Sequence, residues 1–239
     1  MAISRSITKK YLESSLEENE NPLIKPEPRM LPYLLNEKKS FFIFNLIKTS
    51  KFLKLAGNVL QKQAEKGYKF LFVGTNHKIS SLLITESFIT KNYYINSRWL
   101  GGVLTNWQIL QKRIEKLKFL EELTQKNLSR AIKKKNIAAI KKEIKKLNHL
   151  FIGIKKMKVF PQVIIFVDTI KNFSAIKECL KLGIPTMAII DGESNPKSIQ
   201  YPIISNKSPD LLVEFLVQYL NGKILAGYNN RRFKLSKLI

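Results

Sequence analysis

Short apolar runs alternate with longer amphipathic segments along much of the chain. Residues 40–46 (SFFIFNL), 69–73 (KFLFV), 163–167 (VIIFV) and 186–190 (TMAII) are typical of buried strands, and residues 93–96 (YYIN) of a short third strand. Near-continuous apolar strands that alternate with helices indicate a mainly parallel sheet covered on both faces. The pattern therefore predicts an α/β fold built from βαβ units.

Capping residues and glycines set the expected helix ends. Thr49 and Ser50 are candidate N-caps for a helix that ends near Gly67. A second helix is expected over residues 78–90, and a third, following Asp168, ends at Gly183.

Both ends of the chain carry prolines at informative places. Pro22, Pro26, Pro28 and Pro32 fix φ and remove backbone donors, so residues 1–38 are expected to form an extended arm. The last helix is predicted to begin at residues 208–210 (SPD), which supply a cap, a first-turn proline and an acid, and to end at Gly222.

Residues 105–158 break the strand–helix rhythm with two stripes at helical spacing. The first stripe comprises Trp107, Leu110, Ile114, Leu117, Leu120 and Leu123; the second comprises Ile137, Ile140, Ile144, Leu147, Phe151 and Ile154. Steps of three and four residues are typical of a coiled-coil seam. The segment is therefore predicted to be a helical hairpin that projects from the α/β domain.

These patterns divide the chain into four parts. Residues 1–38 form the arm, 39–104 with 159–224 the α/β domain, 105–158 the coiled-coil hairpin insertion, and 225–239 a basic C-terminal tail.

The charge of the chain indicates an anionic partner. Lys and Arg number 42 against 18 Asp and Glu, a formal net charge of +24 that repels itself in the compact state. Residues 126–158 hold twelve basic residues against one acid, Glu143, a local net of +11. A solvated face usually mixes both signs, so the hairpin favours nucleic-acid contact. A membrane surface is the weaker alternative, because the apolar stripe is needed for helix pairing.

Targeting and metal signals are weak. No apolar run reaches the roughly 18 residues of a membrane span. Residues 1–16 lack an apolar signal core, and Glu13 comes early for a transit peptide. Abundant Lys, Asn, Ile and Phe fit AT-rich coding, as in organelle genomes. The single cysteine, Cys179, excludes an internal disulfide, and we expect it to be buried and inert. No metal or other cofactor is expected.

Candidate catalytic groups are sparse. Asp168 and Asp191 each follow a strand, so they could bind Mg²⁺ or act as acid and base, but helix capping and turn bonding are the favoured interpretation. Gly74 follows a strand without the further glycines of a phosphate fingerprint. His77 begins a helix with no partner in sequence, and His149 is expected at a surface or in packing. A nucleotide- or phosphate-binding enzyme therefore remains the alternative function.

The most specific segment is residues 96–107 (NSRWLGGVLTNW). Gly101 and Gly102 permit conformations or approaches that a Cβ would block. Arg98 offers a fork of donors suited to phosphate, and Trp99 a flat amphipathic surface. Asn106 can bond base edges or cap the first hairpin helix.

Several ordered motifs together resemble the family of ribosomal small-subunit protein two, especially its plastid members. The resemblance runs from about residue 29 to 224 and is carried by PRMLPY (28–33), FVGTNHK (72–78), RWLGGVLTNW (98–107), GIKKM (153–157), FPQVIIFVD (160–168), LGIPTMAIID (182–191), NP (195–196) and YPI (201–203). The family's N-terminal Gly-x-x-Phe-Gly-His signature is not recognisable in residues 17–28, and the hairpin tip near 127–136 is shorter and richer in lysine.

The resemblance implies a flavodoxin-like doubly wound parallel sheet, a three-layer α/β/α domain with an inserted coiled-coil hairpin, and no catalysis. It implies a structural role in the small ribosomal subunit, with small-subunit rRNA and neighbouring small-subunit proteins as partners and neither a membrane nor a small-molecule substrate. A plastid ribosome is favoured over a mitochondrial one. The expected rRNA-binding residues are Arg98, Trp99 and Asn106 by the family motif, and by charge Lys112, Arg113, Lys133, Lys134, Lys135, Lys141, Lys142, Lys145, Lys146, Lys155, Lys156 and Lys158.

Overall fold

The core of the molecule is a five-stranded parallel sheet. A computed structural model describes residues 26–38, 41–125, 134–205 and 210–236. The strands are β3 (Phe70–Val73), β4 (Tyr93–Ile95), β5 (Val163–Phe166), β6 (Thr186–Ile190) and β7 (Tyr201–Ile204), in the spatial order β4-β3-β5-β6-β7. Numbered within the sheet, this is the flavodoxin-like order 2-1-3-4-5. The α/β prediction is confirmed.

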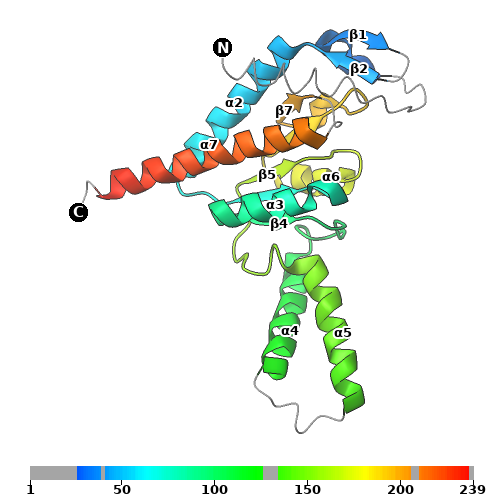
Figure 1. Cartoon of the computed structure of the whole chain (residues 1–239), viewed down its shortest axis with the longest axis vertical. Coiled ribbons are helices and arrows are strands. Elements are labelled where there is room, and N and C mark those ends of the chain that lie inside the picture. The colour runs from blue at the N-terminus through cyan, green and yellow to red at the C-terminus, as the bar shows by residue number, and fades with distance from the viewer. Residues whose placement is uncertain (1–25, 39–40, 126–133, 206–209, 237–239) are drawn as a thin grey trace.

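Helices cover both faces of the sheet (Figure 1). The helices are α2 (Leu46–Glu65), α3 (His77–Thr90), α4 (Trp107–Gln125), α5 (Lys134–Phe151), α6 (Phe173–Leu182) and α7 (Asp210–Ser236). Phe70 and Phe72 of β3 share one buried cluster with α2, α3 and α7. Leu71 and Val73, on the opposite face, share the other with α6 and the base of α4. Because successive side chains of a strand point to opposite faces of the sheet, the two clusters show which helices cover which face.

One predicted strand lies outside the main sheet. Residues 40–46 supply β2 (Phe41–Phe44), which pairs antiparallel with β1 (Leu34–Lys38) in a separate two-stranded sheet. A 3-10 helix, η1 (Pro28–Tyr33), precedes β1 and places Met30 in the core. The described end of the arm therefore packs on the domain, while residues 1–25 lie outside the description.

The pattern also missed β7. Pro202 within Tyr201–Ile204 argues against a strand, because proline cannot donate to the ladder. Within the described part of the chain, β7 is the edge strand and pairs with β6, with Pro202 opposite Ala188, so the missing donor is tolerated.

The start of α2 differs from the prediction. Asn45 is the N-cap, and its side chain accepts from Ile47 N at 3.0 Å and Lys48 N at 3.2 Å. Thr49 and Ser50 lie inside the helix and are buried. Asn is as good an N-cap as Ser or Thr, so the earlier start costs nothing and adds a turn. The left-handed Gly67 and Gly183 end α2 and α6 as predicted.

The prediction that the last helix ends at Gly222 is wrong. α7 continues through Gly222 to Ser236, taking in most of the predicted basic tail. Leu220 and Ile224 on either side of the glycine are fully buried against α2 and α3. Their burial outweighs the cost of an interior glycine, about 1 kcal/mol. The predicted start at residues 208–209 lies outside the description.

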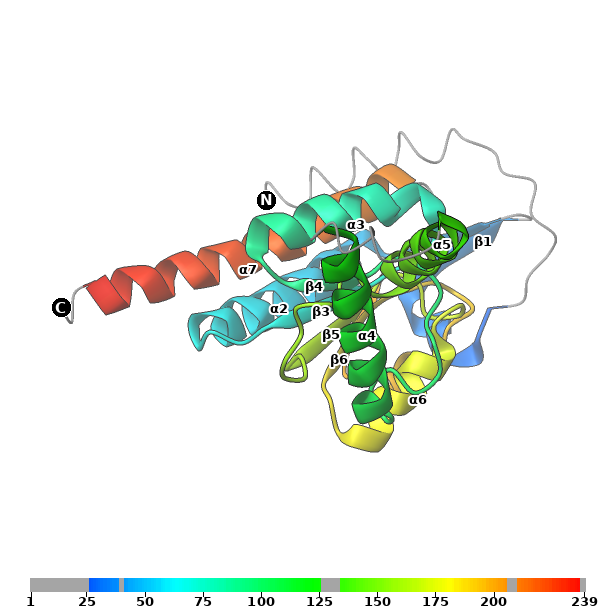
Figure 2. The ribbon, with the colours of Figure 1, turned by 90° about the horizontal axis from the view of Figure 1, so that it is seen from below.

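Helices α4 and α5 project together from the body (Figure 1), and from below α5 is seen nearly along its axis while α4 is seen lengthwise beside it (Figure 2). The stripe residues Leu110, Ile114 and Leu117 belong to the same core cluster as strand residues Leu71 and Ile95. The first limb is therefore anchored in the domain core over about half its length. Coiled-coil pairing of the limbs, like the four-part division of the chain, stays a prediction.

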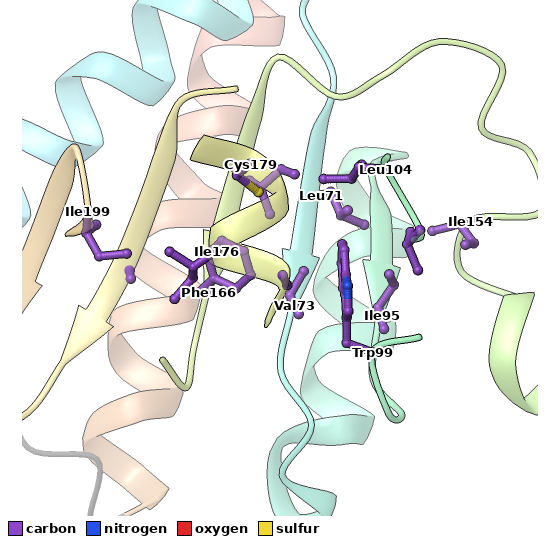
Figure 3. Packing of buried hydrophobic residues seen from close by; sticks show 14 of the residues in the cluster. Leu71, Val73, Ile95, Trp99, Leu104, Ile154, Phe166, Ile176, Cys179 and Ile199 are labelled. Atoms are coloured by element: carbon purple, nitrogen blue, oxygen red, sulfur yellow. The ribbon is translucent and has the colours of Figure 1, made fainter. Parts of the chain in front are cut away.

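Cys179 on α6 is buried in the core cluster that α6 forms with one face of the sheet (Figure 3), as predicted. Burial, with a smaller effect of the Glu178 charge, raises the pKa of the thiol to about 12. We expect a disulfide reagent at pH 8 to modify the native thiol on the order of 10³-fold more slowly than the unfolded one, because the thiolate is the nucleophile. The measurement is reagent absorbance with and without guanidinium; similar rates in both would contradict burial of the thiol.

Candidate nucleic-acid interface

A carboxylate from α6 holds the loop that precedes α4. Glu178 accepts through Oε1 from Trp99 Nε1 at 3.0 Å and Gly102 N at 2.7 Å. Its Oε2 accepts from Leu104 N at 3.0 Å, and from Thr105 N at 3.1 Å and Oγ1 at 3.2 Å. One side chain thus binds five donors of a loop that has little regular structure of its own.

Electrostatics favour the ionised form of Glu178. Burial alone would raise the pKa of this carboxyl, but the hydrogen bonds from Trp99, Gly102, Thr105 and Leu104 outweigh burial, and the pKa is lowered. Sequence reasoning missed Glu178, because it lies more than seventy residues from the loop. Its one sequence signal is that α6 (FSAIKECLKL) contains a single acid.

The loop presents two of its three predicted RNA contacts. Arg98 and Asn106 are exposed at either end of it. The prediction that Trp99 offers a flat surface to a partner is wrong. Trp99 is 5% exposed and packs among Leu71, Ile95 and Ile154 (Figure 3). The indole fills the core and its N–H finds Glu178, as buried tryptophans usually require.

The two glycines of the loop differ. Gly102 has φ +88°, a conformation that a side chain rarely adopts, so its prediction is confirmed. A Cβ on Gly101 would meet nothing within 4 Å, so close packing does not explain that glycine.

The hairpin carries a basic groove between α4 and α5. A hollow of about 540 Å³ is lined by apolar residues of α5 and by five charged side chains, of which Lys116 and Glu143 pair with each other and Arg113, Lys142 and Lys146 add three further cations. Lys142 and Lys146 lie on one face because they are four residues apart. Cations distant in sequence therefore converge on one concave surface.

Ion pairs across the hairpin fix its geometry. Lys116 Nζ lies 2.6 Å from Glu143 Oε1, and Asn148 Nδ2 donates to Glu121 Oε1 at 2.9 Å. Lys155 pairs with the other oxygen of Glu121. Burial alone would raise the pKa of Glu121, but the hydrogen bonds from Lys155 and Asn148 outweigh burial, and the pKa is lowered. Lys155, predicted to contact RNA, is thus engaged within the protein.

The remaining predicted lysines are placed as follows. Lys112, Lys141, Lys145, Lys156 and Lys158 are exposed but do not line the groove. Lys133 lies outside the described residues, and for Lys134 and Lys135 the structure describes the backbone of α5 but not the side chains.

The turn after α5 seats the hairpin against the sheet edge. Tyr94 N in β4 donates to Gly153 O at 3.3 Å. A Cβ on Gly153 would overlap Tyr94 O, so the GIKKM turn needs glycine to pass this close to the strand.

At the carboxyl ends of the strands, acidic side chains accept hydrogen bonds from the turns that carry them. Asp168 Oδ1 accepts from Lys171 N at 3.3 Å, and the buried Asp191 accepts from Ser194 Oγ at 2.7 Å. Thr169 and Ser194 hydroxyls lie 2.6 Å apart. Capping and turn bonding, one of the two interpretations of these acids, is therefore what the structure displays.

Other candidate groups lie apart. His77 begins α3 and His149 lies on α5, both exposed. Within the described ranges, no three His, Cys, Asp or Glu residues gather as metal ligands would. None of the helices searched in the same ranges combines the length and apolarity needed to span a bilayer.

Comparisons with known proteins all indicate the same family. The sequence model of the family described as ribosomal protein S2 matches residues 24–227. The small ribosomal subunit protein uS2c of Trieres chinensis is 38% identical over 200 residues, covering 84% of this chain and 87% of its own. That of Cyanidium caldarium is 38% identical over 207 residues, 86% and 85% of the two chains. Small ribosomal subunit protein uS2 of Thermosynechococcus vestitus is 34% identical over 200 residues, 84% and 76%.

Proposed function

The chain belongs to the ribosomal protein S2 family, and on that premise we propose that it binds rRNA within the small ribosomal subunit of a plastid. Membership makes it a structural constituent of that subunit. The observation that carries the RNA proposal is the groove where Arg113, Lys142 and Lys146 converge on a protein of net charge +24. Counterion release on phosphate contact makes such a surface favourable for RNA.

The loop supports the same proposal. Glu178 fixes the loop backbone, so Arg98 and Asn106 stand exposed on a rigid scaffold rather than on a mobile segment. Less conformational entropy is then lost on binding. An Arg fork suits phosphate, and an Asn amide suits a base edge or a ribose. We propose these two residues as a second group of contacts beside the groove.

The plastid location is supported by the relatives. The protein is named uS2c in Trieres chinensis, Cyanidium caldarium and Porphyra purpurea, and the lysine-rich composition agrees with coding in an organelle genome. A mitochondrial ribosome is the alternative location. Neighbouring small-subunit proteins are the further partners, and neither a membrane nor a small-molecule substrate belongs to the proposal.

A structural role, not catalysis, also fits the sheet edge. The carboxylates of Asp168 and Asp191 accept hydrogen bonds from their own turns. Submillimolar binding of nucleotide with Mg²⁺ in calorimetry, lost on Asp168→Ala, would instead support an enzyme.

The test of the proposed function is sedimentation. A tagged chain in plastid lysate is expected to migrate with small subunits and 70S-type particles on a sucrose gradient. Ribonuclease treatment should release it to the top of the gradient. A free peak without ribonuclease, or co-migration with mitochondrial particles alone, would refute the plastid proposal.

A further inference from the structure

A second basic hollow lies well away from the hairpin. It occupies about 330 Å³ between the end of α3, the start of β3 and the last turns of α7. Four cations line it, and its lining contains no carboxylate. They are Lys69, Lys91, Arg231 and Arg232. Figure 1 shows this end of α7 projecting at the side of the body, whereas the hairpin leaves from below.

The segments that carry these cations are fixed by the fold. Lys69 Nζ donates to Lys91 O at 2.8 Å and lies 5.2 Å from the centre of the Tyr228 ring. The Tyr228 hydroxyl donates to Tyr68 O at 2.6 Å. The Arg231 guanidinium lies over Gly67, where a Cβ would overlap it. The hollow is therefore formed by tertiary packing and is not a chance run of basic sequence.

Gathering these charges is unfavourable for the protein alone. Burial, together with the Lys91 charge, lowers the pKa of Lys69, so the cluster repels itself. Lys91 adopts φ 53° and is the one non-glycine residue with positive φ among the described residues. Backbone strain of this kind persists where surrounding structure imposes it and often marks a functional position.

Helix dipoles do not account for the cluster. The carboxyl ends of α2, α3 and α7 lie near the hollow and attract cations, but each is equivalent to about half an elementary charge. Three such ends offset fewer than two of the four cations. Glu65, which lies nearby, already accepts from Asn230 at 2.9 Å and Lys234 at 3.1 Å and does not line the hollow. Among the described residues no carboxylate lines the hollow, and an external anion would supply the compensating charge.

We propose that the hollow formed by Lys69, Lys91, Arg231 and Arg232 binds backbone phosphates of an rRNA segment distinct from the one in the hairpin groove. The proposal rests on the proposed function for the identity of the polyanion. The volume fits a phosphate with part of its ribose, and residues 229–236 are all exposed, so the helix end can lie along a strand of RNA. The protein then joins two RNA segments through two separate surfaces.

Lys91→Gly is the informative variant. It removes the Lys91 charge yet relieves the left-handed strain, and it keeps the carbonyl that accepts from Lys69. We combine it with Arg231→Gln and Arg232→Gln in the full chain. The matched control neutralises the exposed Lys171, Lys177 and Lys181 on the α6 side of the sheet. Binding to protein-free plastid small-subunit rRNA is measured across a salt series by filter retention.

The hollow variant is expected to flatten the slope of log affinity against log salt by roughly two to three units, because each phosphate that is no longer neutralised removes about one unit. It should also remove one of two protected regions in a hydroxyl-radical footprint. Lys91→Gly alone should melt no lower than the parent. A slope and footprint equal to those of the control would overturn the proposal. So would submillimolar binding of ATP or inorganic phosphate to the parent that is abolished in Lys91→Gly, because the hollow would then serve a free ligand.

The two proposals can fail separately. If rRNA binding is lost in the groove variants but not in the hollow variant, this inference is refuted and the proposed function is supported. Loss of assembly into subunits with unchanged rRNA binding would mean that the hollow docks an acidic protein, which also overturns the inference. A chain that fails to sediment with small subunits defeats the proposed function itself.

Discussion

Replacing Arg113, Lys142 and Lys146 together with glutamine is expected to weaken binding to small-subunit rRNA on the order of 10²-fold at 0.1 M salt. Each cation that no longer pairs with a phosphate flattens the slope of log affinity against log salt by roughly 0.7–0.9, so three should remove two to three units. Glutamine retains most of each side chain, and the three residues are exposed, so the substitutions should leave the fold intact. Filter binding in a salt series measures both quantities.

The hairpin offers a control matched in charge and location. Lys112, Lys141 and Lys145 are exposed on the same two helices but do not line the groove. Their replacement with glutamine changes net charge equally and should cost less affinity. Equal losses in the two triple variants would show that diffuse charge, not the groove, attracts the RNA. Unchanged binding in both would reduce the hairpin to a solvated spacer.

Glu178→Gln is expected to lower the free energy of unfolding by about 3 kcal/mol, or roughly 6–12 °C in Tm for a chain of this length. The carboxylate accepts from five donors, and an amide that accepts through one atom leaves some of them facing its NH₂ group. Trp99 loses its fixed partner, so near-ultraviolet circular dichroism should change as well. Thermal melts without RNA measure the effect.

Glu115→Gln provides the comparison, because it removes the same charge from an exposed position of α4. Its Tm should stay within about 2 °C of the parent, since exposed substitutions usually change stability by under 0.5 kcal/mol. Equal melting of the two variants would mean that the loop does not depend on Glu178.

The acid dependence of stability has a defined sign. The folded state lowers the pKa of Glu178, so this group contributes stability above its unfolded pKa of about 4.3 and loses it as pH falls through the folded value. The parent should therefore destabilise more steeply than Glu178→Gln below about pH 4.3. The pKa of Glu121 is also lowered, so the variant should still lose some stability as the pH falls. Parallel acid limbs would exclude Glu178 as the titrating group.

Errors in the predicted elements have local physical causes. Gly222 and Pro202 are breakers by propensity, yet burial of Leu220 and Ile224 sustains α7, and an edge position tolerates Pro202. The strand in residues 40–46 was predicted, but not that it pairs with β1 in a separate sheet, because pairing depends on tertiary contacts. Trp99 was expected to contact RNA because of its flat amphipathic ring and its place in the family motif, whereas the loop fold buries the indole.

The sequence by itself determined the α/β class, most strands, the two hairpin helices and their basic surface, because apolar periodicity and charge are local properties of the chain. The family, too, could be identified from ordered motifs. Only the tertiary structure decided which cations meet. Arg113 and Lys146 in the groove, Lys91 and Arg231 in the second hollow, and Glu178 beneath its loop are joined by packing between elements distant in sequence. A linear pattern shows which side chains face outward, but their convergence depends on the angles at which helices cross and strands pair.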